Sequence, residues 1–69
     1  MEYTVELKKI DARRSLVVWV TPEGHKKFVI CSYYDPAQPV GQQWCWGHYF
    51  TDIEDAVAYI QEIRHEKEV

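Results

Sequence analysis

The segment that decides the fold is Gly41-Gln-Gln-Trp-Cys-Trp-Gly-His-Tyr-Phe50, which continues into Thr51-Asp-Ile-Glu-Asp-Ala-Val-Ala-Tyr-Ile60. It predicts an aromatic strand over residues 42–50 that stops at a capped, amphipathic helix. Two of the three Trp and four of the ten aromatic residues fall between Trp44 and Phe50. This concentration of large apolar side chains predicts where the core lies.

The helix that follows this strand has a start signal and two distinct sides. Thr51 and Glu54 have the spacing of a capping box, so the helix is expected to begin at Thr51. Apolar residues recur at helical spacing in one stripe: Ile53, Ala56, Val57, Ile60 and Ile63. A second set falls together on roughly the opposite side: Asp52, Asp55, Tyr59, Glu62 and Glu66. We therefore expect an acidic, solvent-facing helix surface.

Three further strands are expected upstream. Residues 3–10 alternate apolar and polar side chains, which is the period of a half-buried strand, and residues 16–20 form a short β-branched run. Residues 26–34 form the next strand, and residues 35–41 a loop in which two prolines forbid regular pairing. The 69 residues thus predict a single small α+β domain. Its architecture is a four-stranded antiparallel meander with one C-terminal amphipathic helix packed on one face (ββββα).

The turn between the second and third strands sets their register. Thr21-Pro-Glu-Gly-His25 is a hairpin signal in which Gly supplies a positive φ, and it pairs Thr21 with His25. One face of the sheet then receives Leu16, Val18, Val20, Phe28 and Ile30. The other face receives Val17, Trp19, Val29, Cys31 and Tyr33. A simple hairpin between the last two strands would place Cys31 opposite Cys45.

The sheet has more apolar surface than one helix can cover. A helix is about 10 Å wide, whereas four strands about 4.8 Å apart span nearly twice that width. The side chains available to line the second face are apolar or aromatic: Val17, Trp19, Val29, Cys31, Tyr33, Cys45 and Tyr49. An exposed patch of this kind marks a protein interface. The alternative is that Lys and Arg stems, the proline loop and the termini fold over it.

Charge is unevenly distributed along the chain, whose formal net charge is −3. Residues 1–50 carry +1 and residues 51–69 carry −4. The acidic C-terminal third argues against contact with a nucleic-acid backbone and favours a basic partner. Without a bilayer-spanning run or a recognisable signal peptide, we expect a cytoplasmic protein in which Cys31 and Cys45 are reduced.

Catalytic and metal chemistry find little support in the sequence. A zinc site would need Cys31, Cys45, His25 and His48, of which only Cys45 and His48 are close in sequence, and in a strand those two face opposite ways. No third group orients a Cys–His pair, and the three glycines lack the spacing of a phosphate-binding loop. We expect a protein that is not an enzyme and that uses no cofactor and no metal.

Basic residues gather at the predicted tip of the first hairpin: Lys8, Lys9, Arg13 and Arg14. Beside exposed aromatic rings, such residues would neutralise phosphates while the rings stack on bases. The alternative is ordinary edge-strand charge, which protects a sheet from edge-to-edge aggregation. The net charge of −3 favours this alternative.

The segment Trp46-Gly-His-Tyr-Phe-Thr-Asp-Ile-Glu-Asp-Ala-Val-Ala-Tyr-Ile60 resembles the strand-to-helix corner of the arm-binding N-terminal domains of phage-type integrases. Those domains are three-stranded sheets with one C-terminal helix, and the resemblance, over about a quarter of the chain, implies nucleic-acid binding. The chain departs from them because it offers an apolar face and an acidic helix in place of a basic sheet face. In character alone it also resembles compact, acidic stand-alone inhibitors of phages and mobile elements, including anti-CRISPR and anti-restriction proteins.

These observations support three functional hypotheses. The favoured one is a small acidic protein-binding module, an inhibitor or adaptor that docks on a basic, nucleic-acid-handling protein surface. Its predicted contact residues are Trp19, Tyr33, Tyr49, Asp52, Asp55, Tyr59, Glu62 and Glu66. The second is a nucleic-acid-binding module that uses Lys8, Lys9, Arg13 and Arg14. The third is a structural homodimer formed through the aromatic sheet face.

Overall fold

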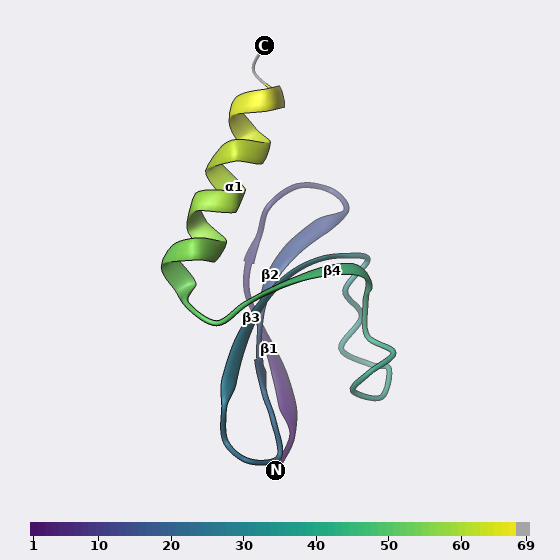
Figure 1. Cartoon of the computed structure of the whole chain (residues 1–69). Helices are drawn as coiled ribbons and strands as arrows, with labels where there is room; N and C mark the ends of the chain where they lie inside the picture. Colours follow the sequence, from purple (N-terminus) through teal and green to yellow (C-terminus); the bar gives the residue numbers. More distant parts are fainter. Residues whose placement is uncertain (68–69) are drawn as a thin grey trace.

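The chain folds as four antiparallel strands followed by one helix, as the sequence predicts (Figure 1). The structure is a computed structural model that describes residues 1–67, with side chains up to residue 64. The strands form one sheet in the order β1-β2-β3-β4, with bounds β1 (Tyr3–Lys9), β2 (Arg14–Val20), β3 (Lys26–Ser32) and β4 (Cys45–Phe50). The helix α1 (Ile53–Lys67) follows β4.

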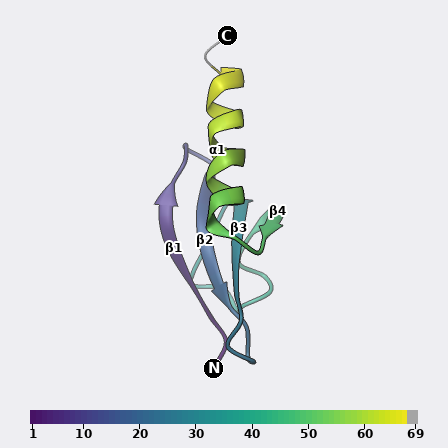
Figure 2. The same ribbon diagram turned by 60° about the vertical axis from the view of Figure 1, so that its left-hand side comes forward.

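The sheet is the middle of three layers. In Figure 1, α1 lies to the left of the sheet and residues 33–44, which we call the roof loop, lie to its right. Figure 2 shows α1 in front of β2 and β3, with β1 standing to one side. The N-terminus and the last turn of α1 lie at opposite ends of the molecule (Figures 1 and 2).

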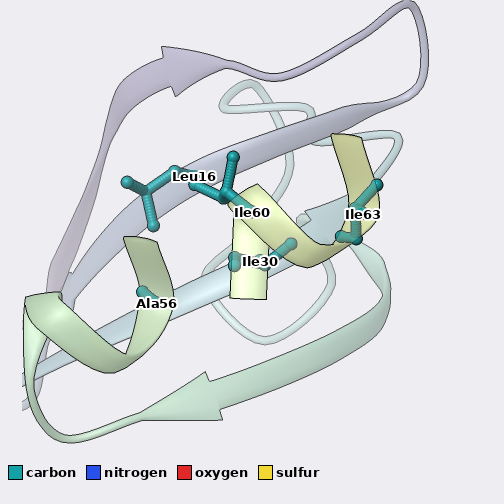
Figure 3. Close-up of a cluster of buried hydrophobic side chains, with 5 residues drawn as sticks. All are labelled: Leu16, Ile30, Ala56, Ile60 and Ile63. Atoms are coloured by element: carbon teal, nitrogen blue, oxygen red, sulfur yellow. The ribbon is translucent and has the colours of Figure 1, made fainter. Parts of the chain in front are cut away.

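The first core lies between α1 and the sheet. Its buried side chains are Leu16, Ile30, Ala56, Ile60 and Ile63 (Figure 3). The predicted apolar stripe of the helix is confirmed at the last three of these positions. Fully burying an aliphatic side chain of this size stabilises a fold by about 1.5–3 kcal/mol, so these contacts hold the helix on the sheet.

One helix covers this face incompletely, as the width argument predicts. Ile53 and Val57, at the flank of the stripe, remain 45% and 41% exposed. On β1, alternate apolar side chains are also about half exposed: Tyr3, Val5 and Leu7. They line a shallow groove of about 290 Å³ together with Val18, Val20, Lys26 and Phe28.

The predicted register of β2 and β3 is confirmed. The Thr21 N–H donates to the His25 carbonyl at 2.8 Å, and Gly24 takes the positive φ of 90°. Leu16 then pairs with Ile30, which directs both side chains toward α1. The two sets of alternating residues therefore face the sides that the turn indicated.

The prediction that the second face of the sheet is exposed is wrong at its centre. Val17, Val29 and Cys31 are at most 1% exposed. They are buried because the roof loop folds back over the sheet and packs Tyr34 and Trp44 against them. The alternative, in which the proline loop covers this face, is the arrangement that the chain adopts.

Hydrogen bonds fasten the roof loop to β1. The buried Gln43 side chain donates to the Gln38 carbonyl at 3.0 Å and to the Pro36 carbonyl at 3.4 Å. Its Oε1 accepts the hydroxyl proton of Thr4 on β1. Because that proton is used, the Tyr34 hydroxyl donates to Thr4 Oγ1, at 2.9 Å. Hydrogen bonds to Thr4 thus hold the roof loop near both of its ends, at Tyr34 and at Gln43.

A bulge interrupts the pairing of β3 with β4. Cys45 pairs with Ser32, which leaves Trp46 and Gly47 together opposite Cys31. The prediction that Cys31 lies opposite Cys45 is therefore wrong by one residue. The extra residue in β4 was not visible in the alternation of side chains.

Gly47 makes room for the aromatic cover. A Cβ at this position would lie 2.8 Å from Trp44 Nε1 and 3.1 Å from the Tyr49 ring. Both rings lie close above the backbone of β4, and the Trp44 indole N–H donates to the Tyr49 hydroxyl at 3.0 Å. A residue without a side chain is required for this approach.

β3 and β4 are each shorter than predicted at the end that joins the roof loop. β3 ends at Ser32 rather than at residue 34, because Tyr33 takes a φ of 56° and turns the chain out of the sheet. β4 begins at Cys45 rather than at residue 42, because residues 42–44 belong to the roof loop. Both differences result from the loop crossing the sheet.

The helix begins two residues later than predicted. Its first residue is Ile53, and the Asp52 carbonyl accepts the first helical hydrogen bond from the Ala56 N–H at 3.4 Å. Asp52 therefore occupies the N-cap position that the capping-box pattern assigned to Thr51. An acidic residue is favourable here because of the helix dipole.

Removing the indole that covers the sheet should destabilise the fold. We expect Trp44→Ala to lower the free energy of unfolding by about 3 kcal/mol, because it uncovers the second core, formed by Val17, Val29 and Cys31. Trp46→Ala is the matched control, since Trp46 is 77% exposed, and it should cost less than about 1 kcal/mol. Urea unfolding followed by circular dichroism measures both. Equal losses in the two variants would contradict the roof-loop arrangement.

The two thiols should differ sharply in reactivity. Desolvation, with a smaller contribution from the charge of Glu6, raises the pKa of the buried Cys31 thiol to about 11, whereas Cys45 is exposed. A thiol reagent at about pH 8 should modify Cys45 at once and Cys31 only on unfolding. The pKa of Cys31 is higher in the folded chain than in the unfolded chain. The stability that the neutral Cys31 thiol contributes is therefore complete below about pH 9 and is lost as the pH rises through about 11. Rapid double labelling of the native chain would contradict this burial.

Candidate functional site

Tyr59 fixes the orientation of the acidic side of α1. Its half-buried ring packs 4.9 Å from the His48 ring and 5.6 Å from the Phe50 ring, measured between centroids. The prediction that Tyr59 shares a solvent-facing side opposite the apolar stripe is therefore wrong. At 100° per residue, Tyr59 lies only about 60° from Ala56, so it reaches β4 at the flank of the core.

The acidic residues follow the same flank. Asp55 and Glu62 stand four residues before and three residues after Tyr59, so they lie on its side of the helix. Both are exposed, as is Asp52 at the start of the helix. We call these three residues the acidic flank. The side chain of Glu66, which the same pattern includes, lies outside the described residues.

β4, beside the acidic flank, is an edge strand of the sheet. The outer side of an edge strand presents backbone N–H and C=O groups that have no partner strand. Tyr49 and Trp46 on this strand are 54% and 77% exposed, and His48 is exposed as well. The structure thus brings acidic and aromatic side chains to the two sides of one open strand.

Two of the predicted aromatic contact residues, Trp19 and Tyr49, interact with other side chains of the chain. Trp19 is half-buried, its indole N–H donates to Glu2 Oε2 at 2.9 Å, and the Lys27 ammonium lies 5.6 Å above its ring. Tyr49 accepts the Trp44 hydrogen bond but keeps half of its surface exposed. Tyr33, 55% exposed, lies away from both at the far end of β3. Of these three residues only Tyr49 belongs to β4, the strand beside the acidic flank, and its ring packs against Trp19 and Trp44 on the face opposite α1.

Trp46, 77% exposed, is the most exposed aromatic residue of the chain, and the predicted contact set omitted it. It takes a φ of 48°, which costs a non-glycine residue about 1–2 kcal/mol. In a bulge of this kind the left-handed position is usually glycine. A side-chain alternation cannot reveal a bulge, and the single available signal was a glycine, Gly47, inside a strand pattern.

The predicted basic residues lie where the sequence placed them, at the turn between β1 and β2. Lys8, Lys9 and Arg13 are exposed. Arg14 is half-buried and pairs with Asp11, with its Nε and Nη2 each 2.9 Å from Asp11 Oδ2. This ion pair reduces the charge that Arg14 presents outward.

Within the part of the chain that the structure describes, no three His, Cys, Asp or Glu side chains come together as metal ligands. The helix, over its described residues, is neither long nor apolar enough to cross a membrane.

Comparison of the chain with protein-family models, with curated proteins and with solved structures gave no match. The candidate site therefore rests on the geometry of β4 and α1.

The strain at the bulge should be measurable. We expect Trp46→Gly to raise the free energy of unfolding by about 0.5–1 kcal/mol, because glycine takes a positive φ freely and the lost ring is exposed. Urea unfolding of this variant against the parent chain measures the difference. A loss of more than about 1 kcal/mol would mean that the Trp46 ring supports the fold.

Proposed function

We propose that this chain is a small acidic protein-binding module that docks on a basic surface of a partner protein through the β4 side of the molecule. The observation that carries the proposal is the packing of Tyr59 on His48 and Phe50, which holds the acidic flank beside an open strand edge. Acidic side chains steer the approach of a basic partner and raise its association rate. Exposed aromatic side chains supply contact area.

The open edge suits an extended segment of the partner. A peptide strand added to a sheet edge gains main-chain hydrogen bonds, and its successive side chains point to opposite faces. Side chains toward α1 would meet Asp55 and Glu62, whereas side chains toward the roof loop would meet Tyr49 and Trp44. The geometry therefore favours a segment that alternates basic and apolar residues.

A module of this kind acts by occupying a surface, as an inhibitor or an adaptor, and not as an enzyme. Basic, extended segments are common on proteins that handle nucleic acids, which makes such a protein the proposed partner, in the cytoplasm. We favour this function over a homodimer through the aromatic sheet face, because Val17 and Val29 at the centre of that face are fully buried within one chain. No cofactor enters this proposal.

The test begins with the identification of a partner and continues with a charge swap. The tagged chain captures proteins from lysate of its source after nuclease treatment, and the recovered protein is then purified. We expect Asp55→Lys/Glu62→Lys to weaken its binding about tenfold or more, mainly through a slower association rate. The dependence of affinity on salt should flatten in the same variant.

The matched control is Glu6→Lys/Glu23→Lys, which makes the same change in net charge at positions outside α1 and β4. It should leave affinity within about threefold of the parent chain. Equal weakening in both variants would mean that net charge and not the acidic flank attracts the partner. Unchanged affinity in the α1 variant would remove the acidic flank from the interface.

A further inference from the structure

An open pocket of about 320 Å³ lies at the end of the sheet where β2 begins, β3 ends and β4 bulges. It is lined by Arg13, Arg14, Ser32, Tyr33 and Trp46. Two arginines, a serine and two aromatic residues from three separate segments of the chain thus meet at this pocket. The volume is at the small end of the roughly 300–1,000 Å³ typical of ligand pockets, which suits one nucleotide-sized ligand.

The two aromatic residues of this pocket are held in strained backbone conformations. Tyr33 and Trp46, with φ of 56° and 48°, are the non-glycine residues with positive φ among the described residues. Turning the chain requires these dihedral angles, but glycine would adopt them at lower cost. Folding gains little from the two rings, which are 55% and 77% exposed. Strained residues of this kind concentrate at ligand sites.

The Asp11 carboxylate fixes the turn that carries both arginines and holds the Arg14 side chain. Asp11 Oδ1 accepts the backbone N–H groups of Arg13 and Arg14 at 2.9 and 2.8 Å, which fixes the turn. Asp11 Oδ2 takes the Nε and Nη2 groups of Arg14 at 2.9 Å each. A guanidinium has five N–H donors, so the positioned Arg14 keeps donors for a ligand. Arg13 adds a second, exposed guanidinium.

We infer that this pocket binds a nucleoside phosphate, with the phosphate at Arg13 and Arg14 and the base stacked on Trp46 and Tyr33. Guanidinium groups bind phosphate oxygens through paired hydrogen bonds, and aromatic rings stack on any base. The same chemistry is presented by a free nucleotide and by a nucleotide within a single strand. Lys8 and Lys9 on the same hairpin extend the positive charge beyond the pocket. This pocket shares Trp46 with the β4 side proposed to bind a protein, but it includes no residue of the acidic flank.

The test is a titration of the full chain followed by the indole N–H signal of Trp46 in a ¹H–¹⁵N NMR spectrum. The probes are adenosine monophosphate, adenosine, inorganic phosphate and an oligothymidylate of about six nucleotides, each at about 50 mM salt. We expect the monophosphate to shift the Trp46 signal in a saturable way, and adenosine and phosphate alone to bind at least about tenfold more weakly. Tighter binding of the oligonucleotide than of the monophosphate would identify a single strand as the ligand, and the reverse order a free nucleotide.

Matched substitutions assign the binding to the pocket, and in all variants the backbone N–H signal of Tyr33 serves as the readout, because Trp46→Gly lacks the indole. Trp46→Gly removes a stacking ring without the backbone strain and should weaken binding by about 5- to 150-fold, and Arg13→Gln should weaken it by about tenfold or more. Tyr3→Ala removes a half-exposed ring at the other end of the sheet, and Arg64→Gln removes an equal charge from α1. These two controls should stay within about threefold of the parent chain.

Three results would overturn the inference. One is the absence of a saturable Trp46 shift with either nucleotide probe at about 5 mM. Another is equal weakening by the pocket variants and their controls, because binding would then follow net charge alone. The third is saturable binding of a phosphotyrosine peptide with no response to nucleotides, because the pocket would then recognise a modified protein.

Discussion

A single helix cannot shield both faces of a four-stranded sheet, and in this chain both faces are apolar. The structure meets this constraint by closing the second face with a loop of its own. Trp44 and Tyr34 pack on the buried Val17, Val29 and Cys31, and the loop is tied to β1 through hydrogen bonds. A chain of 69 residues gains a second small core in this way without a second helix.

Closing the face from within the chain determines which surfaces remain for partners. To cross the sheet, the chain leaves β3 at Tyr33 and rejoins the sheet next to the bulge at Trp46, and both residues take the left-handed conformation. The exposed rings therefore lie at the rim of the sheet and not at its centre. Both rings adjoin the arginines of the first hairpin, and β4 continues from Trp46 to run beside the acidic flank of α1. The two proposed sites are consequences of the same loop.

The parts of the structure that follow from periodicity could be predicted from the sequence. Alternation in the strands, the Thr21–His25 turn and the apolar stripe of the helix gave the ββββα order and the faces of β2 and β3. The roof loop could not be derived, because nothing in the segment rich in proline and glutamine indicates that Gln43 would be buried with its amide satisfied by carbonyls of the same loop. The position of Tyr59 could not be predicted either, because it depends on the direction in which α1 crosses the sheet.

For the candidate sites, the sequence indicated which charged residues cluster but not which residues lie next to them. The acidic residues and the basic hairpin were visible in the sequence as charge clusters. Their neighbours depend on long-range packing: Tyr59 brings the acids to β4, and the bulge brings Trp46 to the arginines. A bulge adds one residue without breaking the apolar pattern, so its effect on Cys45 and Trp46 could not be derived from alternation.

The measurement that tests this account most directly is a nuclear Overhauser spectrum of the isotopically labelled chain at a concentration where sedimentation shows a monomer. We expect cross-peaks between the Trp44 indole ring and the methyl groups of the buried valines on the second face of the sheet. The absence of these cross-peaks, with a Trp44 indole N–H that exchanges freely with solvent, would contradict it. The second face would then be open, and a partner or a second copy of the chain would be needed to cover it.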